Sequence, residues 1–191
     1  MALAREFSRP VAVGDLPEAG EAFEVTATPD ERRALAERFG LLALDSLAAR
    51  GRLERTEPAG VVRLSGTLEA SVVQECVVSL EPVASTLREP LWRYFGVGPD
   101  APPATAAAAG DDAGEVVVGP EEEEVVEPVA GDVLDVGEVV AEELALALDP
   151  YPRLPNAEEL VARRLGAKVT LNAPEEERDR PFAVLRRGRT N

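Results

Sequence analysis

The stretch from Arg52 to Phe95 constrains the fold more than any other part of this 191-residue chain. It is rich in β-branched residues, and turn residues interrupt it at Pro58-Ala59-Gly60, at Gly66 and at Glu81-Pro82. Short β-compatible runs between turns are typical of antiparallel strands that follow one another in sequence. We therefore predict three or four strands that form a meander, the core sheet, with one strand running through Cys76 to Leu80.

Two further strands and a helix are predicted before this region. Phe7 to Val13 and Ala22 to Thr28 are β-compatible runs separated by turn residues. Thr28, Pro29 and Glu31 form the pattern of a capping box, which marks the start of a helix.

The helix that begins there is predicted to extend from Glu31 to Arg50, because Leu35, Phe39, Leu42 and Leu47 recur at near-helical spacing. Gly51 is expected to stop it. Gly40 leaves two alternatives open, a first short helix that ends there or one long helix that bends.

A second main helix is predicted from Val136 to Leu148, with Asp135 as its N-cap. Its apolar face consists of Val136, Val140, Leu144 and Ala147, with Val139 and Leu146 beside it. The helix ends at Asp149-Pro150. A short helix from Ala157 to Leu165 is expected before Gly166.

These elements predict a single α+β domain over residues 1–170, in which the antiparallel meander is covered on one face by the two main helices. Residues 99–128 are predicted to be a disordered acidic insertion, because they are rich in Pro, Ala, Gly, Asp and Glu, contain no basic residue and cannot bury enough apolar area to fold. Val116 to Val118 could add a short strand to it. Residues 171–191 are predicted to be a flexible charged tail.

The composition excludes several kinds of active site. Cys76 is the single cysteine, so it can form no disulfide within the chain and no cysteine-rich metal cage. The chain has no histidine, which removes the Ser-His-Asp and Cys-His arrangements, and Lys168 is its only lysine. We predict no catalytic, cofactor-binding or metal-binding residue, and we expect Cys76 to be buried and structural because no basic neighbour lowers the pKa of its thiol.

Three segments remain as candidate binding residues. The carboxylates of Glu142-Glu143 and of Glu121 to Glu124 are potential cation ligands, but adjacent acids on a helix point in different directions, so a solvated face is the favoured interpretation. In the C-terminal tail, apolar residues stand next to arginines, and this segment either docks on a partner or folds back on the core. The candidate partner-binding residues there are Phe182, Val184, Leu185, Arg186 and Arg187.

The net charge of -16 points to a basic partner. Such a chain repels phosphate backbones and attracts basic proteins, so DNA and naked RNA are poor first choices. The N-terminus lacks the apolar run of a signal peptide, and no stretch reaches the length of a membrane span, so we expect a cytoplasmic protein without membrane contact. Abundant Ala, Val and Arg with almost no Lys are typical of a GC-rich bacterial genome.

Three segments in this order resemble the YceD family of large ribosomal RNA subunit accumulation proteins. They are the Cys76 strand with Leu80-Glu81-Pro82-Val83, the Asp132 to Asp149 segment followed by Pro152, and Pro181-Phe182-Ala183-Val184-Leu185. The resemblance implies a role in accumulation or maturation of large-subunit rRNA and no enzymatic activity. Many family members have a Cys-x-x-Cys pair where this chain has Cys76 and Ser79, so any zinc site of those relatives is expected to be absent here.

Three hypotheses follow for function. The first is a non-enzymatic ribosome-biogenesis factor that binds a basic ribosomal protein or a precursor of the large subunit. The second is a nuclease that cuts precursor RNA with carboxylate-bound magnesium. The third is direct or limited contact with rRNA, which requires a set of arginines to gather on one face of the sheet, namely Arg52, Arg55, Arg63, Arg88 and Arg93.

Overall fold

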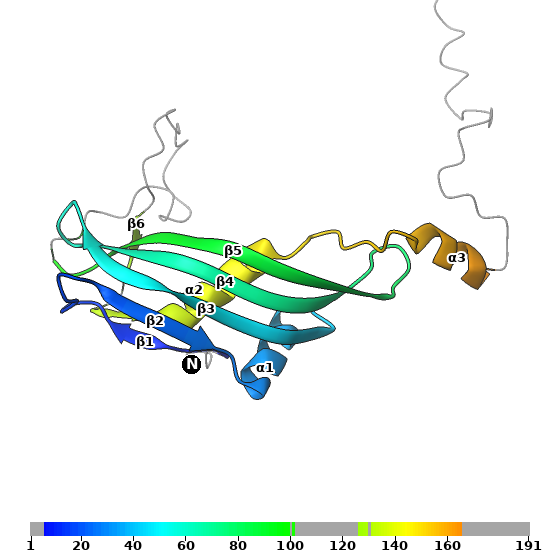
Figure 1. The fold of residues 1–191 in the computed structure, drawn as a ribbon, viewed down its shortest axis with the longest axis horizontal. Helices are drawn as coiled ribbons and strands as arrows, with labels where there is room; N and C mark the ends of the chain where they lie inside the picture. Colours follow the sequence, from blue (N-terminus) through cyan, green and yellow to red (C-terminus); the bar gives the residue numbers. More distant parts are fainter. Residues whose placement is uncertain (1–5, 100, 102–125, 130, 166–191) are drawn as a thin grey trace, which may run out of the picture.

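The computed structural model describes residues 6–99, 101, 126–129 and 131–165. Over these residues the chain forms a five-stranded sheet in the order β2-β3-β4-β5-β6, a two-stranded sheet of β1 and β7, and three helices (Figure 1). The strands are β1 (Pro10–Ala12), β2 (Glu21–Thr26), β3 (Ala43–Thr56), β4 (Val61–Glu75), β5 (Pro82–Gly96), β6 (Val126–Pro128) and β7 (Val133–Asp135). The helices are α1 (Pro29–Phe39), α2 (Val136–Ala147) and α3 (Ala157–Leu165).

The α+β class and the antiparallel meander are confirmed. Strands β3, β4 and β5 are consecutive, long and antiparallel, and β2 pairs with the free side of β3. The predicted run from Phe7 to Val13 is a strand over Pro10–Ala12, and it pairs with β7 outside the main sheet. One part of the predicted acidic insertion was wrong, because Val126–Pro128 is strand β6, parallel to the end of β5. Apart from Pro99 and Ala101, the rest of that insertion lies outside the described residues, as does the tail of residues 171–191.

The prediction of a helix from Glu31 to Arg50 was wrong beyond Phe39. Gly40 ends α1 in the left-handed conformation with φ 65°, which glycine adopts without strain, and its N–H donates to the carbonyls of Ala36 and Glu37. Of the two alternatives that Gly40 left open, the short helix is correct. From Ala43 onward the chain is strand β3, and Leu47 is buried as a core-facing residue of this strand rather than of a helix.

Gly51 and Gly66 were predicted to stop a helix and to form a turn, and both predictions were wrong. They lie opposite each other in the middle of β3 and β4. A Cβ atom on Gly51 would stand 2.1 Å from the carbonyl oxygen of Ser65 and 2.9 Å from the ring of Phe23. The two glycines therefore allow a close backbone approach, and the Phe23 side chain of β2 covers it.

The helix α2 packs on the same face of the sheet as α1 (Figure 1). The buried residues of this helix include Val136, Val139, Val140 and Leu144, as the periodicity predicted. Leu146 was expected beside them but is 77% exposed, because α2 turns that side toward solvent. The core therefore lies between one face of the sheet and α1, α2 and β1.

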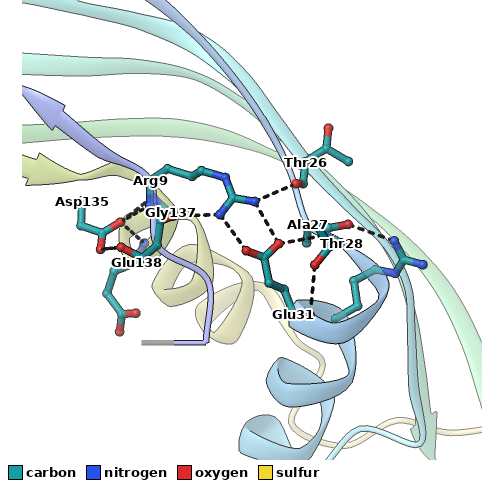
Figure 2. Close-up of polar contacts among 10 residues, drawn as sticks. Arg9, Thr26, Ala27, Thr28, Glu31, Asp135, Gly137 and Glu138 are labelled. Carbon is teal, nitrogen blue, oxygen red and sulfur yellow. Dashed lines mark hydrogen bonds and ion pairs between the residues drawn. The ribbon is translucent and has the colours of Figure 1, made fainter. Parts of the chain in front are cut away.

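A polar network joins the N-terminal segment to both main helices (Figure 2). The Arg9 guanidinium donates to both carboxylate oxygens of Glu31 at 2.7 and 2.9 Å and to the Thr26 carbonyl. The Arg9 backbone N–H donates to the Asp135 carboxylate at 2.7 Å, and that carboxylate also caps α2 at Gly137 and Glu138.

The capping box at Thr28 is confirmed, and its acidic member has a second role. Glu31 accepts from the Thr28 backbone N–H and also binds Arg9. The hydrogen bonds from Arg9 lower the pKa of Glu31 to about 2, with further lowering by Thr28. One carboxylate thus closes the start of α1 and holds the N-terminal strand in place.

Candidate interaction surface

The second face of the sheet is turned away from α1 and α2 (Figure 1), and within the described residues no helix or strand covers it. Because side chains alternate along a strand, the register assigns residues to this face, which we call the open face. Its charged residues are the arginines Arg50, Arg52, Arg63 and Arg88 and the glutamates Glu24, Glu54, Glu69 and Glu75. Charges balance on the open face, although the whole chain carries -16.

Trp92 is the most prominent apolar side chain of the open face. It is 56% exposed, whereas Tyr94, the next outward residue on β5, is 8% exposed. The two rings meet edge to face with their centroids 6.1 Å apart and their planes at 79°. The Arg63 guanidinium lies 5.0 Å from the centroid of the Trp92 ring and donates to Glu54 at 2.7 Å. The indole is therefore held by neighbours on two sides while more than half of its surface contacts solvent.

The other open-face arginines make weaker ion pairs. Arg88 and Arg50 share Glu69 at 3.6 and 4.0 Å, with side chains that are 70% and 69% exposed. Arg52 donates to the Ala19 carbonyl, lies 3.7 Å from Glu54 and is 49% exposed. Exposed pairs at such distances contribute little to stability. These guanidinium groups can therefore exchange their present partners for another anion at small cost.

Five arginines were singled out for a possible RNA surface, and the sheet separates them. Arg52, Arg63 and Arg88 lie on the open face, and Arg50, which was not singled out, lies with them. Arg55 and Arg93 point to the opposite face. The two groups of arginines can be told apart only when the pairing register of the strands is known, because side chains alternate between the two faces of a sheet. The sequence does not supply that register.

Arg93 forms ion pairs with two acidic residues of α2 and with one of β6. It binds the carboxylates of Glu127, Glu142 and Glu143, and its side chain is 18% exposed. Despite its burial, which opposes the charge, hydrogen bonds to Glu127 and Glu143 raise the pKa of Arg93. The prediction of a solvated face is wrong for Glu143, whose side chain is 19% exposed, whereas Glu142 is 47% exposed, and both carboxylates bind Arg93. The segment Glu121 to Glu124 lies outside the described residues.

An acidic cavity lies at the end of the sheet where β3 turns into β4. Its volume is about 630 Å³, and its lining includes Asp15, Glu57, Asp132 and Arg55. The Arg55 guanidinium donates to the carbonyl of Gly14. None of the three carboxylates forms an ion pair with a described residue. We call this region the acidic cavity.

Cys76 does not lie within a strand as predicted, because β4 ends at Glu75 and a tight turn follows. Leu80 has φ 61° in this turn, and its N–H donates to the Cys76 carbonyl at 2.9 Å. The Cys76 thiol is buried as expected. Burial raises the pKa of this thiol, but donors from Ser79, Leu154 and Val78 outweigh it and lower the pKa to about 6. The turn predicted at Glu81-Pro82 is present, but the chain reversal begins earlier than expected, because β4 ends at Glu75 and β5 begins at Pro82.

The turn keeps positions 76 and 79 together without a metal-binding donor set. The Ser79 N–H donates to the Cys76 sulfur at 3.4 Å, and the Ser79 hydroxyl accepts from the Glu81 N–H. One thiol and one committed hydroxyl do not supply the ligands of a structural zinc ion. In the described part of the chain, no three His, Cys, Asp or Glu side chains form a group that could hold a metal.

The predicted partner-binding residues Phe182, Val184, Leu185, Arg186 and Arg187 lie outside the described residues. Among the helices that the structure does describe, none has the length and apolar character needed to cross a membrane.

Comparison with known proteins identifies the family. The family model "Large ribosomal RNA subunit accumulation protein YceD" matches residues 64–187, from β4 through the end of α3 and beyond. No curated protein and no solved structure matches. The match covers more than half of the chain and contains the segments on which the resemblance was based, so the chain belongs to the YceD family of large ribosomal RNA subunit accumulation proteins.

Proposed function

We propose that this chain supports accumulation of large-subunit rRNA as a non-enzymatic factor that binds a basic ribosomal protein on the assembling large subunit. The family supplies the process, and the acidic cavity is the observation that supports the kind of partner. A recessed site with three carboxylates and one arginine attracts a lysine or arginine side chain.

The placement of paired and unpaired acids supports the same partner. Glu31, Glu54, Glu69, Glu138 and Glu143 all hold arginines of this chain. The cavity carboxylates have no such partner among the described residues, so their charge is available to a second molecule. A basic protein that enters the cavity also stays close to Pro99, where the acidic sequence of residues 100–125 begins.

Co-purification of large-subunit components from cell lysate at low and high salt tests this function. We expect basic ribosomal proteins to be recovered at low salt and lost at high salt, because screening weakens contacts between exposed charges. The variant Asp15→Asn/Glu57→Gln/Asp132→Asn should lose most of this recovery.

A matched control removes the same charge elsewhere. Glu37, Asp45 and Glu159 are exposed and lie outside the cavity lining, so neutralising all three should leave recovery unchanged. Recovery of no large-subunit component at either salt concentration, or equal losses for both triple variants, would contradict the proposal. Incubation of the purified chain with precursor rRNA and Mg²⁺ tests the non-enzymatic part, which cleavage dependent on specific carboxylates would overturn.

A further inference from the structure

The open face differs from the rest of the chain in its charge and in its exposed aromatic surface. Four arginines and four glutamates balance there, while the acidic excess of the chain lies elsewhere. Arg63 covers one side of the Trp92 ring, but the outward residues of β4 opposite Trp92 and opposite Pro90 are small, namely Ser65 and Thr67. The indole therefore stands above small polar side chains that leave room for a flat group beside it.

The pairing register of β3, β4 and β5 places Arg52 at a distance from Trp92 that one nucleotide can span. Trp92 pairs with Ser65, and Ser65 pairs with Arg52, so the three residues form one row across β5, β4 and β3. Adjacent strands are about 4.8 Å apart, which separates the backbones of Trp92 and Arg52 by roughly 10 Å. In the next row Arg50 lies opposite Thr67. A ring stacked on Trp92 would thus have its attached phosphate close to exposed guanidinium groups.

The indole is also oriented in advance. Arg63 lies over its ring, Tyr94 contacts it edge to face, and Glu54 fixes Arg63 in turn. An aromatic side chain held in this way loses little entropy when a second ring stacks on it. Base stacking on an aromatic side chain is a general means of binding single strands, because every base has a π face.

We propose that the open face binds unpaired RNA, with one base stacked on Trp92 and the adjoining phosphates contacted by Arg52 and Arg50. The inference rests on the proposed function and deepens it, since it adds an RNA contact to the protein contact of the acidic cavity. A basic protein is better matched to the acidic cavity, where three carboxylates face one arginine, than to this face, where the charges balance. Paired RNA is also unsuitable, since its bases are not free to stack on a side chain.

Trp92 is the only tryptophan of the chain, so its fluorescence reports directly on this face. Titration of the full chain with a twelve-nucleotide single-stranded RNA should quench the emission to saturation, and a duplex of the same length should not. Two phosphate contacts predict that log K falls with log salt with a slope of about -1.4. Binding should be weak, because only two phosphates are contacted and the chain as a whole carries a net charge of -16.

Variants separate stacking from charge when binding is measured by anisotropy of a labelled RNA. Trp92→Ala should weaken binding at least about fivefold, whereas Trp92→Phe should keep most of it because phenylalanine still stacks. Arg50→Ala/Arg52→Ala should weaken binding and flatten the salt slope. The control Arg33→Ala/Arg163→Ala removes the same charge from exposed positions on α1 and α3 and should have no such effect. Circular dichroism checks that each variant is folded. The Trp92 variants should fold, because the Trp92 side chain is exposed.

Three results would overturn the proposal. One is absence of RNA binding by the wild-type chain while the acidic-cavity variant still loses ribosomal protein, which leaves the proposed function standing. Another is RNA binding that survives both Trp92→Ala and Arg50→Ala/Arg52→Ala, because the contact then lies elsewhere. The last is loss of ribosomal protein by Trp92→Ala in RNase-treated lysate, which would make the open face a protein-docking surface.

Discussion

Replacement of Glu31 by Gln should destabilise the fold in a manner that depends strongly on pH. Glutamine can still occupy the third position of the capping box, so the change removes the ion pair with Arg9 while keeping the cap. The Glu31 carboxylate is 21% exposed and the Arg9 side chain 31%, so solvent only partly screens the pair. The pKa of Glu31 is lowered from 4.5 to about 2. At about 1.36 kcal/mol per unit, this shift corresponds to an upper value of about 3 kcal/mol.

The sign of the pH dependence follows from the lowered pKa. The contribution of Glu31 is fully present above the unfolded pKa of 4.5 and is lost as pH falls toward the folded pKa of about 2. Urea denaturation at pH 7 should therefore show Glu31→Gln to be about 2 to 3 kcal/mol less stable than wild type. By pH 3 the difference should shrink by about 2 kcal/mol.

Asp30 is the matched control in the same turn of α1. Its ion pair with Arg33 has side chains that are 88% and 76% exposed. Asp30→Asn should cost less than about 0.5 kcal/mol, because exposed pairs are screened by water and salt. Equal losses for Glu31→Gln and Asp30→Asn, or a Glu31→Gln effect that is the same at pH 7 and pH 3, would refute the reasoning.

Three further predictions concern residues that the packing holds tightly. Gly51→Ala should lower the free energy of unfolding by more than about 2 kcal/mol in thermal or urea denaturation, because its Cβ would stand 2.1 Å from a backbone oxygen. Gly40→Ala should lower it by about 1 kcal/mol, because this position has open space around it but a positive φ. Arg93→Met should cost about 3 kcal/mol because it leaves three carboxylates facing one another, and the 70% exposed Arg88→Met should cost less than about 0.5 kcal/mol. Cys76 should react with a thiol reagent far more slowly in native buffer at pH 7 than in urea, despite its lowered pKa, because it is buried, and equal rates would contradict that burial.

The elements that the sequence predicts well are those with local signals. Thr28 and Asp135 mark the starts of α1 and α2 through short-range hydrogen bonds, and both caps form as expected. The sequence of strand β3 resembles that of a helix, because Ala48, Ala49 and Gly51 mask its alternation and a bulge between Leu44 and Ser46 shifts the pattern.

The open face could not be predicted from sequence in the same way. Arg52, Ser65 and Trp92 are far apart along the chain, and only the register of two strand pairs brings them into one row. A shift of one residue in the β4–β5 pairing would send Trp92 to the core, and the same shift in the β3–β4 pairing would send Arg52 there. The family resemblance supplied the process, but it contained no information on this arrangement.

The partial pairing of β5 has a consequence for association between copies of the chain. Strand β6 pairs with only the last three residues of β5, so from Pro82 to Arg93 that border of the sheet has no strand partner among the described residues. Unpaired borders of long strands are templates for cross-pairing and aggregation. Pro82 and Pro90 lack the N–H that a docking strand would need, and Arg88 and Glu89 add charge between them. The missing N–H groups and the charges between them thus disfavour addition of another strand along this border of the described sheet.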